Sequence, residues 1–135
     1  MKLGRQVAWF AVGGVIGFIV DAGIVHVLVR RTGWNPYLAR VLSFLVAASV
    51  TWAWNRTFTF AHRRHLRAGA EWSRWVTMMG GGALLNYAIY AVLVACVAMV
   101  QRWPVLGVAA GSVVAAMVNF FAARAVVFGK PEKSA

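Results

Sequence analysis

The sequence predicts an all-α, polytopic membrane protein: four transmembrane helices built as two parallel helical-hairpin repeats, with cytoplasmic N and C termini. Three observations support this fold class. Of the 135 residues, 61% are hydrophobic, which is more than an ordinary soluble domain contains. The apolar residues form four segments, each near the ~20 residues that span a hydrocarbon core. A residue pattern in the second segment also recurs in the fourth.

The four apolar segments account for most of the chain. Their approximate bounds are Val7 to Val29, Leu38 to Phe60, Trp75 to Val97 and Val105 to Phe128. The connectors are too short to hold a soluble domain with its own core, so residues 1–135 are predicted to form a single transmembrane domain. The first segment is too long for a cleaved signal peptide and three more follow, so we expect it to be retained.

The formal net charge of +11 does not indicate a nucleic-acid partner, because the basic residues gather at the segment ends and not on one water-exposed face. One side of a four-span arrangement carries Lys2, Arg5, Arg63, Arg64, Arg67, Arg74, Lys130 and Lys133, and the other carries Arg30, Arg31, Arg40 and Arg102. By the positive-inside rule, the termini and the central loop lie in the cytoplasm. A multi-pass protein of the cytoplasmic membrane is therefore predicted.

Two strips of small or polar residues, with a step of four, indicate an internal duplication. The first strip is Ala39, Ser43, Ala47, Thr51 and Asn55, and 68 positions later the second is Gly107, Gly111, Ala115, Asn119 and Ala123. Each strip is followed at once by an arginine, Arg56 or Arg124, and by a phenylalanine four residues further on. Such strips let two helices approach closely in lipid, or could leave a groove. We also expect a homo-oligomer, with the strips as a possible contact.

A carboxylate lies inside the first segment. Asp21 follows Val7 by roughly 21 Å of helix, which puts it in the outer half of the membrane. A charge at that depth has to face the protein interior and find a partner. The nearest cation by depth is Arg40, which enters the second segment from the same side. Two interpretations stay open, a structural tie between the first two helices and a direct role in transport.

The polar residues of the remaining segments are candidate ligand-binding groups. Arg56 and Arg124 can reach the phosphate layer, where a planar guanidinium suits a pair of phosphate oxygens, although plain topology anchors remain the alternative. A shift of 65 residues aligns Gly17 with Gly82 and Asp21 with Asn86. The predicted polar pathway consists of Asp21, Asn55, Asn86 and Asn119, with Thr51 and Ser43 as further polar groups.

The central loop from Ala61 to Arg74 is polybasic and is expected to hold anionic lipid headgroups at about 1 kcal/mol per basic residue. It could also dock a partner enzyme. Three acids and three scattered histidines supply no paired acid and base and no activated nucleophile. We therefore expect no enzyme activity and no cofactor. No metal site is expected either, because the two loop histidines are separated by arginines and a single cysteine completes no cluster.

In this order, the motifs resemble the GtrA-like family of small four-helix membrane proteins over nearly the whole chain. The matching residues are Phe10, Gly13, Gly17 and Asp21, then Leu38 to Arg40, Ser43 and Phe44, then Asn55, Arg56 and Phe58 to Phe60, and finally Asn119, Phe120 and Arg124 to Phe128. Two positions depart from the family pattern: Ala123 precedes Arg124 where an Asn is common, and Thr51 replaces a frequent Asn.

The resemblance implies translocation, or flipping, of a polyprenyl-phosphate-linked sugar across the cytoplasmic membrane for cell-surface polysaccharide and cell-wall synthesis. On that hypothesis Arg56, Arg124 and Arg40 bind the lipid phosphate. The alternative is a non-catalytic membrane scaffold that recruits a polyprenyl-phosphate glycosyltransferase through the central loop. A small-cation exporter is disfavoured, because the arginines near the proposed pathway would repel a cationic substrate.

Overall fold

The computed structural model describes residues 1–63 and 66–129, without the side chains of Pro36, Pro104 and Val105. The elements in chain order are α1 (Leu3–Thr32), α2 (Pro36–Trp54), η1 (Asn55–Thr59), α3 (Ala68–Cys96), α4 (Ala98–Arg102), α5 (Pro104–Ala122) and η2 (Ala123–Val127). Every regular element in this described part is helical. Its helices supply four candidate membrane spans, Leu3–Thr32, Tyr37–Thr59, Ala68–Cys96 and Leu106–Val127. The predicted all-helical, four-span membrane fold is confirmed.

Local sequence signals place the turn between α1 and α2. Gly33 has a φ of 70°, the left-handed conformation that commonly ends a helix at a glycine. Two residues later the Asn35 side chain accepts hydrogen bonds from the backbone N–H groups of Tyr37 at 2.8 Å and Leu38 at 3.4 Å. Because these N–H groups have no partner inside the helix, the Asn35 cap lets α2 start at Pro36, the first helical position.

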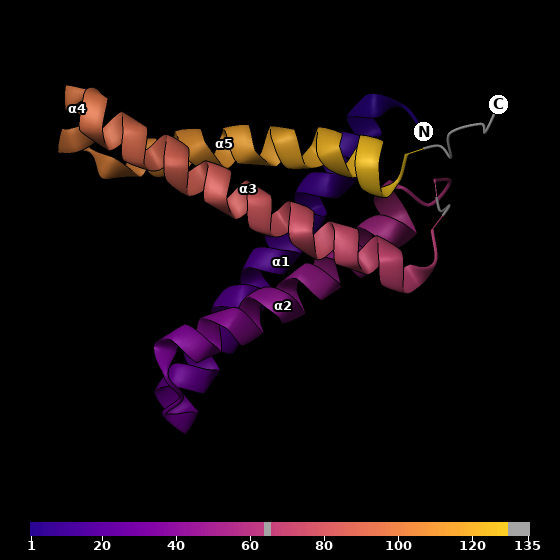
Figure 1. Cartoon of the computed structure of the whole chain (residues 1–135), viewed down its shortest axis with the longest axis horizontal. Coiled ribbons are helices and arrows are strands. Elements are labelled where there is room, and N and C mark those ends of the chain that lie inside the picture. The colour runs from indigo at the N-terminus through magenta and orange to yellow at the C-terminus, as the bar shows by residue number, and fades with distance from the viewer. Residues whose placement is uncertain (64–65, 130–135) are drawn as a thin grey trace.

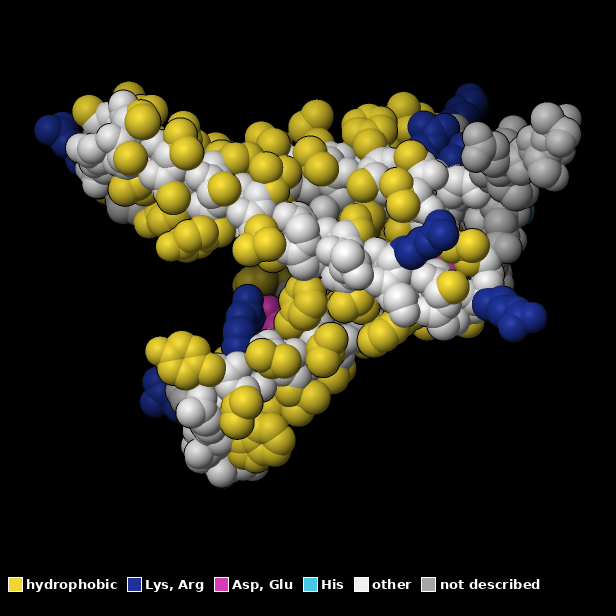
Figure 2. Space-filling model, viewed as in Figure 1, with side chains coloured by type: hydrophobic (Ala, Val, Ile, Leu, Met, Phe, Trp, Pro, Cys, Tyr) yellow, Lys and Arg dark blue, Asp and Glu magenta, His cyan; other side chains and the backbone are white. Residues whose placement is uncertain are grey.

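The two hairpins form a fork (Figure 1). The first hairpin consists of α1 and α2, and the second consists of α3 and α5, with the short α4 at its tip. The hairpins cross near the end that holds Met1 and Gly129, then diverge into two arms, and Figure 2 shows the open notch between these arms. Both hairpins therefore enter and leave at the same end, as parallel repeats require. The assignment of that end to the cytoplasm stays a prediction.

The two small-residue strips hold each hairpin together. In the first strip Ala39, Ser43 and Asn55 are at most 1% exposed, and a Cβ added to Gly17 of α1 would overlap the Thr51 methyl group. In the second strip, a Cβ added to Gly107 would lie 3.1 Å from the ring of Tyr90 on α3. The strips therefore form tight helix pairs. Four strip residues, Thr51, Asn55, Ala115 and Asn119, also line a cavity between the hairpins. A contact of the strips with a second copy of the chain stays a prediction, as does the homo-oligomer itself.

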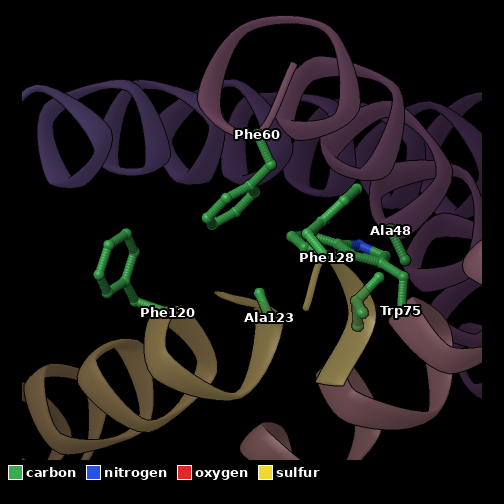
Figure 3. Close-up of a cluster of buried hydrophobic side chains, with 7 residues drawn as sticks. Ala48, Phe60, Trp75, Phe120, Ala123 and Phe128 are labelled. Carbon is green, nitrogen blue, oxygen red and sulfur yellow. The ribbon is translucent and has the colours of Figure 1, made fainter. Parts of the chain in front are cut away.

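Where the hairpins meet, a cluster of aromatic side chains joins them (Figure 3). The rings of Phe60 and Phe128 stack with centroids 4.7 Å apart, and Phe10 meets Trp75 edge-on at 6.3 Å. Both pairs join positions that the repeat makes equivalent, because the shift of 68 aligns Phe60 with Phe128 and the shift of 65 aligns Phe10 with Trp75. The internal duplication is thus also a structural one, with its pseudo-twofold axis passing through these pairs.

Two differences from the sequence-based expectation concern the central loop. The third helix begins at Ala68, not near Trp75, so Glu71 belongs to a helix and not to a loop. Ala68 is able to start the helix although its flanking Arg67 provides no side-chain cap. Three predictions concern residues outside the described part of the chain: the headgroup contact of Arg64, the cytoplasmic side of Lys130 and Lys133, and the absence of a metal site at His65.

Candidate functional site: a polar cavity between the hairpins

A cavity of about 450 Å³ lies between the two hairpins. All four long helices contribute to its wall, which consists of Phe10, Gly14, Phe18, Phe44, Thr51, Asn55, Trp75, Met79, Gly82, Ala83, Asn86, Ser112, Ala115, Ala116 and Asn119. Six of these side chains carry hydrogen-bonding groups: Thr51, Asn55, Trp75, Asn86, Ser112 and Asn119. Polar side chains at this depth in a membrane protein are costly and are typical of a substrate path.

Asn86 of α3 points toward α5, and Asn119 of α5 points toward α3. A glycine on the facing helix makes room for each side chain. Asn86 on α3 faces Gly111 on α5, where an added Cβ would come within 2.7 Å of the Asn86 carbonyl oxygen. Asn119 on α5 faces Gly82 on α3, where an added Cβ would come within 2.6 Å of the Asn119 Cγ. The two glycines therefore provide the space that lets both amides stand between the helices.

These two amides retain most of their hydrogen-bonding capacity. The Asn86 Nδ2 lies 3.5 Å from the Ser112 Oγ, and the Asn119 Nδ2 lies 3.9 Å from the Met79 sulfur. Both contacts are long, and a primary amide offers two donors and one acceptor oxygen. Asn86 and Asn119 can consequently hydrogen-bond to a hydroxyl-rich group that enters the cavity.

Asn55 also borders the cavity, but its side chain is already engaged. It is 1% exposed, its Nδ2 donates to the Thr51 carbonyl at 2.8 Å, and its Oδ1 accepts from the Thr59 hydroxyl at 2.6 Å. Thr51 is similarly occupied, since its hydroxyl donates to the Ala48 carbonyl at 3.0 Å and accepts from the Trp75 indole at 3.3 Å. Ser43, the other polar residue of this strip, donates to the Arg40 carbonyl and lies outside the cavity wall.

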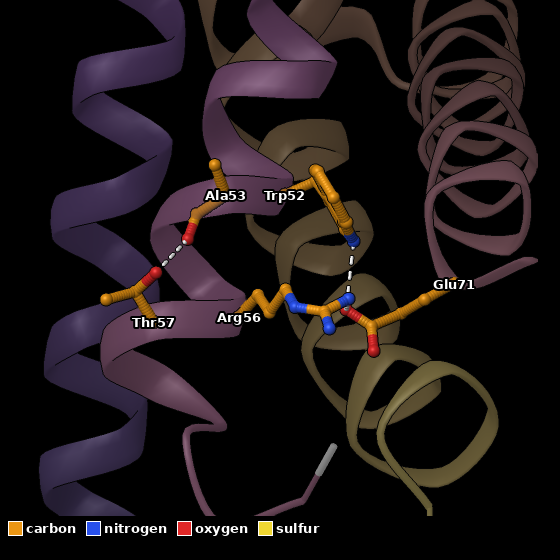
Figure 4. A network of polar contacts seen from close by, with 5 residues as sticks. All are labelled: Trp52, Ala53, Arg56, Thr57 and Glu71. Carbon is orange, nitrogen blue, oxygen red and sulfur yellow. Dashed lines mark hydrogen bonds and ion pairs between the residues drawn. The ribbon is translucent and has the colours of Figure 1, made fainter. Parts of the chain in front are cut away.

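Arg56 lies in η1 and is paired with a buried acid (Figure 4). Its Nη1 is 3.1 Å from the Glu71 Oε1, and its guanidinium lies 5.4 Å from the centre of the Trp52 ring. The Trp52 indole donates to the same Glu71 oxygen at 3.0 Å. The Glu71 side chain is fully buried, whereas that of Arg56 keeps 23% exposure. The pair links the end of the first hairpin to the start of the second.

Sequence reasoning placed Glu71 among the loop residues and gave it no role. One signal was available: Glu71 precedes the buried Trp75 by one helical turn, which puts both side chains on one face of a helix. That signal depends on α3 starting at Ala68, and the basic composition of the segment concealed the start. The second Glu71 oxygen, Oε2, is buried without a hydrogen-bond partner among the described residues.

Arg124 occupies the equivalent position in η2 but has different surroundings. The shift of 65 that relates α1 to α3 puts Gln6 where Glu71 stands, so the acid has been replaced by an amide. Gln6 is 6% exposed, and in the described part of the chain its Oε1 has no hydrogen-bond partner. A side chain of the basic loop contacts the backbone of η2, because the Arg63 Nη1 donates to the Arg124 carbonyl at 3.3 Å. The two arginines therefore occupy equivalent backbone positions, but Arg56 has an acid at the position where Arg124 has the neutral Gln6.

The predicted pairing of Asp21 with Arg40 is present, with 2.5 Å between the Asp21 Oδ2 and the Arg40 Nη1. The pair joins α1 to α2 within the first hairpin. The Arg40 side chain is 64% exposed, and neither residue belongs to the cavity wall. The structure therefore brings Asn55, Asn86 and Asn119 together at the cavity, but it separates Asp21 and Arg40 from them.

Within residues 1–63 and 66–129, no group of three or more His, Cys, Asp or Glu side chains is arranged to hold a metal ion. The fold and the cavity together define a class, a duplicated four-helix membrane protein whose halves enclose a mostly apolar cavity with a few amide and hydroxyl groups in its wall. Residues 9–132 match the family model described as GtrA/DPMS, transmembrane domain, and the chain belongs to this family. The match connects it with the handling of polyprenyl-phosphate sugars. A comparison with curated proteins gives no match.

Proposed function

We propose that the protein translocates a polyprenyl-phosphate-linked sugar across the cytoplasmic membrane, for use in cell-surface polysaccharide synthesis. The observation that carries the proposal is the cavity between the hairpins, where the amides of Asn86 and Asn119 have hydrogen-bonding capacity to spare. Each hydrogen bond to a sugar hydroxyl would contribute about 0.5 to 1.5 kcal/mol. The cavity would shelter the sugar from the lipid interior while the headgroup crosses.

The phosphate needs a cationic partner at each stage. Arg56 and Arg124 stand in matched segments at the end of the fork that holds Met1, and a guanidinium can bind two phosphate oxygens at once. Arg56 holds Glu71 through one nitrogen, so its remaining N–H groups are available to a phosphate that competes with the carboxylate. Arg40, exposed near the start of α2, offers a third guanidinium toward the opposite end.

We further propose that the protein performs no chemistry on its substrate. The acids of the described spans are both in ion pairs, Asp21 with Arg40 and Glu71 with Arg56, and neither lines the cavity. Purified protein incubated with radiolabelled polyprenyl phosphate and a nucleotide-sugar should produce no new lipid-linked sugar. Product formation without an added glycosyltransferase would contradict this proposal.

The scaffold alternative is less well supported by the geometry of the central loop. Arg63 donates to the Arg124 carbonyl at 3.3 Å, and Arg74 donates to the Val126 carbonyl at 3.4 Å. Both side chains thus pack on η2 of the same chain, which leaves fewer loop arginines for a partner enzyme. Alanine at Arg63, Arg67 and Arg74 should therefore leave both vesicle transport and glycosylation in cells intact. Loss of glycosylation in cells while vesicle transport persists would favour the scaffold.

Reconstitution in vesicles tests the proposal. A polyprenyl-phosphate sugar is loaded, and a membrane-impermeant oxidant reports how fast the sugars of the inner leaflet reach the outside. The Asn86→Ala, Asn119→Ala double variant should transport about tenfold more slowly, because two hydrogen bonds of about 0.5 to 1.5 kcal/mol are lost. Gln101→Ala, which removes an exposed amide next to the outer turn, is the matched control and should keep the wild-type rate. Equal rates for the three proteins would exclude the cavity as the sugar site.

A further inference from the structure

An apolar groove of about 590 Å³ runs between α1 and α5, the first and last long helices of the chain. Residues from Val7 to Phe18 form one side, and residues from Ala116 to Phe121 form the other. Every lining side chain is apolar. The helices belong to different repeats, so the groove is a seam between the two hairpins and not a gap within one of them.

The groove is continuous with the polar cavity. Phe10, Gly14, Phe18 and Ala116 line both spaces. A ligand that spans them would meet amide groups at one end and only hydrocarbon at the other. This continuity distinguishes the groove from a lipid-facing depression elsewhere on the surface, where no polar chamber adjoins it.

The internal duplication provides a comparison for this seam, because the pseudo-twofold axis relates α1 with α5 to α3 with α2. The seam between α2 and α3 is closed by tryptophans. The Trp72 indole donates to the Ser49 hydroxyl at 2.9 Å, and the Trp52 indole donates to Glu71 at 3.0 Å. The third, Trp75, donates to the Thr51 hydroxyl at 3.3 Å.

The same positions in the other seam carry side chains that cannot close it in this way. Under the shift of 65, Val7 replaces Trp72 and Phe10 replaces Trp75, and under the shift of 68, Phe120 replaces Trp52. None of these three replacements can donate a side-chain hydrogen bond across the seam. The duplication has thus produced one sealed seam and one open seam.

We infer that the seam between α1 and α5 is the lateral portal of the cavity, and that it binds the prenyl chain of a lipid whose polar head occupies the cavity. This inference rests on the proposed function for the identity of the head. The ligand class is a lipid with a phosphate-linked polar head and a long linear chain of isoprene units. The prenyl chain of the lipid leaves the cavity through the open seam between α1 and α5, and not through the tryptophan-closed seam between α2 and α3.

Two variants that fill the groove test the portal without altering the cavity wall. Ala11→Trp and Met117→Trp change residues that line the groove alone, and the neighbouring Val12→Trp and Val118→Trp are matched controls at exposed positions outside it. Each buried methylene contributes about 0.8 kcal/mol, so loss of two methylenes should slow long-chain transport about tenfold in the groove variants. A short analogue of two isoprene units should cross at the wild-type rate in all four.

Photocrosslinking gives a second readout that does not need transport. A polyprenyl phosphate with a diazirine on its chain should label peptides of α1 and α5, and unlabelled polyprenyl phosphate should compete where phosphatidylglycerol does not. If wild-type protein shows this labelling without transport, the portal stands as a lipid site and the proposed function fails. If long-chain transport proceeds normally in both groove variants, or the labelling is uniform around the helices and resists competition, the portal inference is overturned while the cavity can still be the sugar site.

Discussion

The two hairpins share a backbone design but use their polar residues differently. In the first hairpin Asp21 pairs with Arg40 through one oxygen and Asn55 bonds to Thr51 and Thr59. The Asp21 Oδ1 and the Gln6 Oε1 are the buried exceptions, without a hydrogen-bond partner among the described residues. In the second hairpin Asn86 and Asn119 face the cavity, and their side-chain contacts among the described residues are long ones, to Ser112 and Met79. After duplication, one half thus serves mainly to hold the structure and the other supplies most of the free ligand groups.

The backbone at the two exits shows what the repeat has kept. Residues Asn55–Thr59 and Ala123–Val127 both form a π-helical turn, closed by the Phe60 N–H to the Asn55 carbonyl and by the Phe128 N–H to the Ala123 carbonyl, each at 2.8 Å. The second turn forms without the asparagine side chain. Such single turns often lie at functional sites, and here each one presents an arginine.

A large loss of stability is expected from a side chain placed between α3 and α5. Gly111→Leu should destabilise the second hairpin by about 1 to 3 kcal/mol or more, because even a Cβ there would lie 2.7 Å from the Asn86 carbonyl oxygen. Gly80→Leu, where an added Cβ has no neighbour within 4 Å, is the control. Thermal unfolding in detergent measures both. If Gly111→Leu melts normally but becomes monomeric, the strip is an intermolecular contact after all.

The matched arginines should respond unequally to substitution. Arg56→Ala leaves Glu71 charged and buried, which costs about 3 to 5 kcal/mol in comparable pairs, and adding Glu71→Gln should recover much of the loss. Arg124→Ala should cost under about 1 kcal/mol, since in the described part of the chain Arg124 pairs with no acid. Denaturation in detergent separates the three variants, and equal losses at Arg56 and Arg124 would contradict the assigned asymmetry.

Lysine at the same positions tests the phosphate role. Arg56→Lys and Arg124→Lys keep the charge but lose the planar fork, so transport should fall in both while expression and insertion stay normal. Arg56 should be the more sensitive, because Glu71 and the phosphate share its guanidinium. If both lysine variants transport at the wild-type rate, the arginines are topology anchors, and Arg40 becomes the next phosphate candidate.

The smallest effect is expected at the ion pair of the first hairpin. Asp21→Asn should cost about 1 kcal/mol or less, because the Arg40 side chain is 64% exposed and such pairs contribute little. Since Asp21 does not line the cavity, transport should remain near the wild-type rate. Vesicle transport and detergent unfolding of this variant decide between the two interpretations of Asp21. A complete loss of transport in a stable Asp21→Asn protein would favour a direct role.

The sequence predicted those features that depend on periodicity and depth. The four spans follow from hydrophobic length, the duplication from the shift of 68, and the pairing of Asp21 with Arg40 from their common depth. These properties belong to single segments or to one hairpin, where local geometry is nearly fixed. The motif resemblance likewise led to the family that the match over residues 9–132 establishes.

Contacts between the hairpins could not be predicted in the same way. The role of Glu71 depends on where α3 starts and on Arg56 arriving from the other repeat. The closed and open seams depend on which large side chains meet across helices, and the periodicity of one segment does not contain that information. The strips could be identified from the sequence, but their partner helix could not. Small residues allow close approach by any neighbouring helix and do not specify which one.

The most direct measurement of the central claim compares the binding of a polyprenyl-phosphate sugar with that of bare polyprenyl phosphate. Quenching of the intrinsic tryptophan fluorescence can report on both, because Trp75 lies in the cavity wall. Wild-type protein should bind the sugar-bearing lipid about tenfold more tightly through two hydrogen bonds, and Asn86→Ala with Asn119→Ala should abolish that difference while leaving the affinity for bare lipid unchanged. If the double variant keeps the wild-type preference for the sugar, the cavity does not hold the headgroup.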